Sequence, residues 1–192
     1  MAPAGSASFT GKLLGLANSG ISPQDMHVNV DGPYGEFVDP ANFDTILLIA
    51  GGIGVTPIHS IFRELRMQMM KGNCAHLARV HMLWVVQKRD DLTPFFDTLA
   101  DATNEPLDGK LKVDIYADKD SDIEPGKIFD HHGVKVVGGR PNVGEEINNL
   151  SDDVAAGLRP HVFVCGPPGL AAMADLACLK NGISFHKEVF AF

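Results

Sequence analysis

The stretch that most constrains this chain is residues 47–58, Leu-Leu-Ile-Ala-Gly-Gly-Ile-Gly-Val-Thr-Pro-Ile. The apolar run at residues 45–50 predicts a buried strand, and it passes without a polar loop into glycines, a Thr-Pro step and a helical pattern. Glycines at such a turn let backbone N–H groups approach a ligand, and the next helix directs a partial positive charge at the same place. The stretch therefore predicts an anion site, for example for a pyrophosphate, with a tight structural turn as the alternative.

Length and charge limit the classes of protein that this chain can represent. Its 192 residues suffice for one compact α/β domain, or for a domain with a fragment of another, but not for two full domains. The formal net charge of −8 argues against general nucleic-acid binding, because that affinity comes from basic surface. Any anionic ligand must therefore be held by local positive groups.

Cysteine content and hydropathy indicate in which cellular compartment the chain is expected. The three cysteines are odd in number and far apart, which argues against a disulfide scaffold and is compatible with a reducing compartment. No apolar run approaches the length of a membrane span, and residues 1–8 lack the basic segment followed by an apolar segment that is typical of a secretory signal. We therefore expect that the chain as given neither spans a membrane nor is exported.

From residue 45 onward, predicted strands alternate with predicted helices. Further strands are expected at residues 80–86, 111–116, 161–165 and 183–189, and helices at 57–71, 92–102, 144–158 and 170–179. Residues 117–143 are polar and rich in turn formers, and no strand is predicted there. The alternation predicts an α/β fold in which a five-stranded parallel sheet has helices on both faces. The strand order that we expect for this sheet is 3-2-1-4-5, which the alternation alone does not fix.

A second glycine turn, Gly166-Pro-Pro-Gly169, follows the predicted strand at residues 161–165. Ligands of such sheets bind beyond the carboxyl ends of the strands, where the strand order reverses. In the order 3-2-1-4-5 the two glycine turns are neighbours and enclose one site. Residues 52–57 end in proline and do not match G-x-G-x-x-G, so a nucleotide site of a different type is expected.

Five motifs, in this order, resemble the NAD(P)H-binding half of the ferric reductase and NADPH oxidase flavocytochromes, within the ferredoxin-NADP reductase superfamily. They are DGPYG at residues 31–35, GGIGVTP at 51–57, GRPN at 139–142, CGP at 165–167 and FHKEVF at 185–190. The resemblance extends from residue 9 to residue 190. It implies an electron-input domain that passes hydride from NADPH to FAD, from which electrons reach ferric chelates or oxygen through membrane haems.

The resemblance also implies roles for particular residues. The path of the pyrophosphate and the nicotinamide ribose would be lined by Gly52, Gly54, Val55, Thr56 and Pro57. Cys165 would lie near the nicotinamide, where a small thiol leaves room for hydride transfer, with Gly166 and Pro167 shaping the wall behind it. The alternative is that Cys165 is simply a buried cysteine at a strand end.

Aromatic and basic residues complete the implied site. Phe190 matches the aromatic residue that covers the flavin ring until nicotinamide displaces it, although Phe192 could take this role and either ring could serve only packing. Lys88 and Arg140 are expected to bind the 2′-phosphate and to produce a preference for NADPH. The alternative is that Lys88 simply lies in a solvated turn opposite Asp90 and Asp91. His131 and His132 are adjacent, and the side chains of adjacent residues in an irregular segment rarely bind the same ion, so no metal site is expected.

The chain departs from the family at its beginning. Residues 1–35, with an expected helix at 9–16 and a strand-like pattern at 26–30, resemble only the end of a flavin-binding barrel and a linker, whereas residues 36–192 resemble the NAD(P)H-binding domain. No residue is a convincing ligand for the flavin phosphates. We therefore expect FAD to be held by a domain elsewhere in the same full-length chain or in a partner, and we expect no turnover by this chain alone.

Other functions remain open at this point. The chain could be a free-standing, non-catalytic NADPH-binding module, or part of a soluble flavoprotein reductase of nitrate-reductase type. As part of a flavocytochrome it would lie at the cytoplasmic face of a membrane, and otherwise in the cytoplasm. The sequence does not distinguish ferric chelates from oxygen as the electron acceptor.

Overall fold

The computed structural model describes residues 8–27, 29, 31, 39, 42–104 and 107–188. The chain divides into two compact units, Met1–Val38 and Asp39–Phe192. The first contains helix α1 (Phe9–Asn18) and a short 3-10 helix, η1 (Pro23–Asp25). The Ser8 hydroxyl caps α1 by accepting a hydrogen bond from the Gly11 N–H at 3.1 Å. The predicted helix is confirmed, but the described residues of the strand expected at 26–30 lie in no strand.

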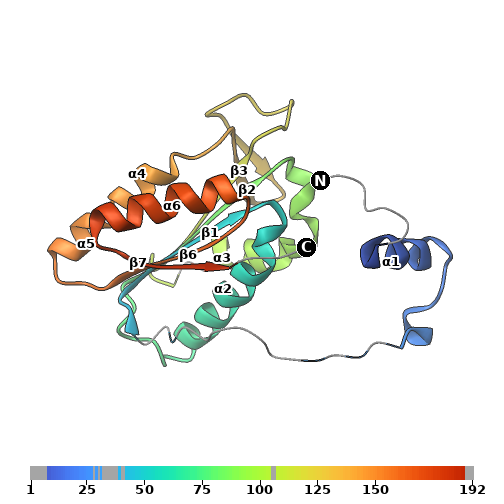
Figure 1. The fold of residues 1–192 in the computed structure, drawn as a ribbon, viewed down its shortest axis with the longest axis horizontal. Helices are drawn as coiled ribbons and strands as arrows, with labels where there is room; N and C mark the ends of the chain where they lie inside the picture. Colours follow the sequence, from blue (N-terminus) through green and yellow to red (C-terminus); the bar gives the residue numbers. More distant parts are fainter. Residues whose placement is uncertain are drawn as a thin grey trace. The chain divides into compact units, whose positions relative to one another are not determined.

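The second unit is built on a seven-stranded mixed sheet with the order β4-β5-β3-β2-β1-β6-β7 (Figure 1). The strands are β1 (Thr45–Gly51), β2 (Arg79–Val86), β3 (Leu111–Ala117), β4 (Ile128–His131), β5 (Val134–Gly138), β6 (Pro160–Cys165) and β7 (Ser184–Glu188). All neighbours pair in parallel except β4 and β5. The five predicted strands occur in the predicted order, but the prediction of a five-stranded, all-parallel sheet is wrong.

The two additional strands form a hairpin within the segment at residues 117–143. His132 and Gly133 have φ angles of 52° and 89°, and two positive φ angles in succession are typical of a type I′ two-residue hairpin turn. The Gly133 N–H donates to the Asp130 carboxylate at 2.7 Å and stabilises the turn. In β5 the side chains of Val134 and Val136 are buried and the intervening lysine is exposed. Such short, half-exposed strands lack the continuous apolar run that identifies the buried strands.

Five α-helices and two 3-10 helices are described in the second unit. They are η3 (Gly52–Gly54), α2 (Val55–Met70), η4 (Arg89–Phe95), α3 (Phe96–Asn104), α4 (Val143–Asn148), α5 (Ser151–Ala155) and α6 (Pro168–Asn181). The helix expected at 92–102 begins as a 3-10 helix that contains Pro94. The helix expected at 144–158 is two short helices, and the side chains of both Ile147 and Leu150 lie in the core.

Both faces of the sheet are covered. One core cluster joins Leu47, Ile49 and Leu83 of the sheet to apolar side chains of α4 and α6. Helix α2 lies on the opposite side of the sheet from α6 (Figure 1), and its side chains Ile58, Phe62 and Leu65 are buried. Within the described residues, none of the helices has the length and apolar character needed to cross a membrane.

Candidate functional site

The two glycine turns meet at the carboxyl edge of the sheet. Strands β1 and β6 are parallel neighbours, with Ala50 opposite Cys165, so both chains leave the sheet side by side. A Cβ atom at Gly166 would lie 3.0 Å from the Cα of Gly51, and a Cβ at Gly54 would overlap the carbonyl oxygen of Cys165. Only glycine permits this backbone approach. The predicted proximity of the two turns is therefore confirmed, and the glycines are needed for packing between them.

Gly52 differs from the other glycines of the turn. It is exposed, has a φ of +55°, and no atom lies within 4 Å of the position that its Cβ would occupy. Its carbonyl oxygen accepts a hydrogen bond from the indole N–H of Trp84 at 3.0 Å. Trp84 is buried in β2, so this bond ties the glycine turn to the neighbouring strand. The space beside Gly52 is open to a ligand.

Two helices begin directly after these turns. Helix α2 begins at Val55 and α6 at Pro168, and neither has an acidic residue in its first turn or a side chain that caps its N-terminus. The partial positive charge at both N-termini is thus not compensated by local carboxylates. Thr56 is exposed in the first turn of α2, where its hydroxyl donates to the Ile53 carbonyl at 3.0 Å. Together the turns and helices can accept an anion in spite of the negative net charge.

Cys165 ends β6 with 1% of its surface exposed. Burial, together with the nearby charge of Glu188, raises the pKa of its thiol, so the sulfur stays protonated at neutral pH. Glu188 lies opposite Cys165 in the register of β6 and β7, and its carboxylate hydrogen-bonds the His186 ring at 3.1 Å. Sequence reasoning missed Glu188, although it belongs to the last motif. Phe190 and Phe192 lie outside the described residues.

The predicted cations follow β2 and β5 at the same carboxyl edge. Lys88 has an exposed side chain, and its backbone N–H donates to the Asp91 carboxylate at 3.0 Å. Arg140 binds Asp118 in a bidentate pair, with Nε to Oδ1 and Nη2 to Oδ2 both at 2.7 Å. This hydrogen bonding lowers the pKa of Asp118. Sequence reasoning identified Arg140 but missed its acidic partner.

The neighbouring basic residue, Arg89, contacts acidic and aromatic side chains of the segment between β3 and the end of β4. Its guanidinium bonds the Asp122 carboxylate at 2.5 Å and lies 4.6 Å from the centre of the Phe129 ring on β4. Its backbone N–H donates to Asp120 at 3.1 Å. Arg89 therefore connects the turn after β2 to the segment that leads into β4, while Lys88 projects from the same turn.

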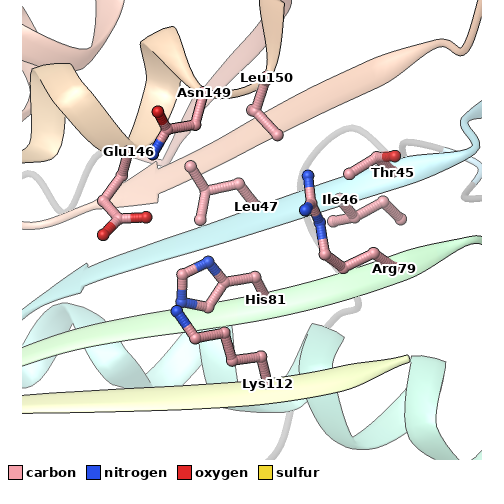
Figure 2. Close-up of a pocket in the computed structure, with 9 residues that line it drawn as sticks. All are labelled: Thr45, Ile46, Leu47, Arg79, His81, Lys112, Glu146, Asn149 and Leu150. Atoms are coloured by element: carbon pink, nitrogen blue, oxygen red, sulfur yellow. The ribbon is translucent and has the colours of Figure 1, made fainter. Parts of the chain in front are cut away.

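A cavity of about 160 Å³ lies at the opposite, amino edge of the sheet (Figure 2). Its lining comprises Thr45, Ile46, Leu47, Arg79, His81, Lys112, Glu146, Asn149 and Leu150. Arg79 pairs with Asp153 at 2.8 Å, and both His81 and Lys112 pair with Asp114, at 2.9 and 2.6 Å. Because it is small for a dinucleotide, this cavity is not assigned to nucleotide binding.

The adjacent histidines lie in the β4–β5 hairpin. The His131 and His132 ring centroids are 4.9 Å apart, and each ring is 6.0 Å from that of Phe96. Among the residues that the structure describes, no group of three or more histidine, cysteine or carboxylate side chains is arranged to hold a metal ion.

Comparison with known proteins gives a consistent result. Residues 43–179 match the model of the ferric reductase NAD binding domain family. A heavy chain of the superoxide-generating NADPH oxidase of Dictyostelium discoideum is 31% identical over 189 residues, which covers 85% of this chain and 26% of that protein. Human dual oxidase 2 is 25% identical over 168 residues, which covers 78% of this chain and 11% of that protein. The chain thus spans about a quarter or less of these relatives.

A solved structure shows the same fold. The CS-b5R domains of human Ncb5or, in an NAD+ form, superpose with a TM-score of 0.59 at 17% sequence identity. The match covers 98% of this chain and 47% of that chain.

Proposed function

The chain belongs to the ferric reductase NAD-binding domain family, and from this premise we propose that it binds NADPH at the carboxyl edge of its sheet and presents the nicotinamide to a flavin held by another domain. One observation supports this site above all. The two glycine turns touch at Gly51 and Gly166, and two helices without acidic first turns begin beside that contact. Backbone N–H groups and two helix N-termini at one place suit a pyrophosphate.

In this proposal the first turn of α2 binds the pyrophosphate. Thr56 supplies its backbone N–H near Gly52 and Gly54, and its hydroxyl can turn from the Ile53 carbonyl to the ligand. Val55 holds the start of the helix in place beside the ligand, because its own N–H donates to the Gly52 carbonyl. Pro57 has no N–H to leave unpaired at a helix start. The open space beside Gly52 admits the ligand to the backbone.

Cys165, Gly166 and Pro167 would form the floor and wall beside the nicotinamide. The protonated, uncharged thiol of Cys165 offers a small contact surface and no negative charge that would hold the nicotinamide in its oxidised, cationic form. Glu188 lies next to it and would set the charge at this end of the site. Phe190 keeps its proposed role at the flavin ring, with Phe192 as the alternative.

Lys88 and Arg140 would provide NADPH selection. Both follow strands on the β3 side of β1, and the adenosine half of a dinucleotide extends along the carboxyl edge from the pyrophosphate. A lysine and an arginine there can pair with the 2′-phosphate that distinguishes NADPH from NADH.

The flavin would come from outside the described residues. We propose that residues 1–35 are the end of a flavin-binding barrel with its linker, and that residues 36–192 are the NAD(P)H-binding domain. The exposed apolar side chains of Phe9, Leu13 and Leu14 on α1 favour further packing partners for the first unit. FAD, when bound by such a domain, accepts hydride and passes electrons on, to ferric chelate or oxygen through membrane haems. The chain would then lie at the cytoplasmic face of the membrane.

The proposed site can be tested by nucleotide titration. Trp84 is the sole tryptophan and contacts Gly52, so its emission should be quenched by energy transfer to a bound reduced nicotinamide. We expect tighter binding of NADPH than of NADH, and Lys88→Gln should weaken NADPH binding by about fivefold without affecting NADH. Lys112→Gln, at the amino edge, is the matched control. Equal affinities for the two nucleotides would refute the preference, and quenching by neither would refute the site.

A further inference from the structure

The pair formed by Asp118 and Arg140 is held rigidly from both sides. Asp118 follows β3, and its N–H donates to the Val86 carbonyl of β2 at 2.9 Å. Arg140 follows β5, and the preceding Gly139 donates to the Ala117 carbonyl of β3 at 2.8 Å. The sheet ladder thus fixes the backbone beside each partner. The two side chains then meet through two parallel hydrogen bonds of 2.7 Å.

This arrangement changes what Arg140 can offer a ligand. Its side chain is 72% exposed, so a ligand can reach it, but the Nε and Nη2 donors are already bound to the carboxylate. The carboxylate of Asp118 is less exposed, at 20%, and ionised. A phosphate that approaches Arg140 must displace this carboxylate from the guanidinium fork or lie near its negative charge. A ligand with a hydroxyl at the same place faces no such conflict.

We propose that Asp118 is a specificity-determining residue that weakens the binding of the 2′-phosphate of NADPH. Its carboxylate is hydrogen-bonded to the Arg140 guanidinium, so NADPH binding requires Arg140 to exchange this carboxylate for the phosphate. The proposal rests on the proposed nucleotide site and deepens it. It implies that the preference for NADPH over NADH is smaller than Lys88 and Arg140 would produce without Asp118.

The test is the Asp118→Asn variant of the whole chain, with dissociation constants for NADPH and NADH measured by quenching of Trp84 emission. Asparagine keeps the shape of the side chain and removes its charge. NADPH should bind about fivefold more tightly, and NADH within about twofold of the unmodified chain. The double variant Asp118→Asn with Arg140→Gln should lose this gain, because the two residues act through each other.

Asp153→Asn is the matched control, because it removes the same charge from an arginine–carboxylate pair at the opposite edge of the sheet, and it should leave both constants unchanged. Weaker NADPH binding by Asp118→Asn would overturn the proposal, because it would show that Asp118 holds Arg140 in position to bind the phosphate. An equal gain for both nucleotides would overturn it too, as a general charge effect. If the unmodified chain binds neither nucleotide, the proposed function itself fails, which is a distinct result.

Discussion

At the scale of single residues, His161 shows how burial controls charge in this fold. It is 3% exposed, stacks on Phe43 at 4.1 Å, and its Nδ1 lies 2.8 Å from the Ser184 hydroxyl. Its buried Nε2 has no hydrogen-bond partner among the described residues. Burial, and then the charge of His186, lower the pKa of His161 to about 4. The folded protein therefore keeps this ring neutral where an unfolded chain would protonate it.

This histidine predicts a loss of stability in mild acid. Between pH 6.5 and about 4 the unfolded chain binds a proton that the folded chain does not, so the free energy of unfolding falls as the pH falls through that window. His161 should contribute a loss of about 2 kcal/mol between pH 7.5 and 5. His161→Phe keeps an aromatic ring beside Phe43 and should remove this part of the pH dependence in urea unfolding. His132→Gln, an exposed histidine, is the control; an unchanged slope in His161→Phe would contradict the assignment.

At the scale of elements, the strand–turn–helix unit of β1, η3 and α2 uses its glycines for different purposes. Gly54 is buried against the backbone of Cys165, and Gly52 is exposed with a left-handed backbone. Gly54 leaves room for the end of the neighbouring strand, and Gly52 adopts the left-handed conformation that the turn uses. The sequence motif alone does not separate these roles, because both positions are simply glycine.

Alanine substitutions at the two positions should therefore differ. Gly54→Ala places a Cβ on the Cys165 carbonyl, which belongs to rigid backbone, so we expect destabilisation of about 3 kcal/mol or more. Gly52→Ala meets no atom and carries only the strain of a positive φ, about 1 kcal/mol. Urea unfolding of both variants measures the difference. A larger effect at Gly52 than at Gly54 would show that the contact between the two turns is not important for stability.

At the scale of the whole molecule, the chain corresponds to a domain-sized part of much longer relatives. It covers 26% of the Dictyostelium oxidase heavy chain and 11% of human dual oxidase 2. Its second unit has its own core and sheet, whereas the described part of the first contains α1 and one short 3-10 helix. In the proposed function, electron transfer depends on a flavin domain in the same full-length chain or in a partner.

Adding a recombinant FAD domain of this family in trans should restore NADPH-dependent dye reduction. Cys165→Trp should slow this reaction by at least about tenfold, because a bulky ring would occupy the nicotinamide position, while Cys165→Ser should retain most of it. Circular dichroism establishes that both variants are folded, and Cys74→Trp, at a partly exposed cysteine outside the site, is the control. An active complex that Cys165→Trp does not slow would refute the role of Cys165. Nucleotide binding without dye reduction would favour the non-catalytic module.

The local pattern was sufficient for much of the fold and for part of the site. Continuous apolar runs such as residues 45–50 identified the buried parallel strands, because such strands are covered on both faces. The glycine turns mark the carboxyl ends of β1 and β6, and the order 3-2-1-4-5 expected for the five predicted strands is confirmed, although the α/β alternation alone does not specify it. The hairpin of β4 and β5 was missed, because both strands are short, β4 is exposed and β5 only half-buried, and the His-Gly turn is a weak local signal.

The α/β class, the buried strands and the place of both glycine turns could be predicted from local sequence patterns, because each depends on residues close together in the chain. Three contacts follow from the packing of the folded chain: the Asp118 carboxylate binds the Arg140 guanidinium, Glu188 lies opposite Cys165, and Gly54 packs against the end of another strand. Each of these contacts joins separate strand ends, so it depends on which strands are neighbours and in what register they pair. Local patterns do not encode that register, because the packing of the whole sheet selects it.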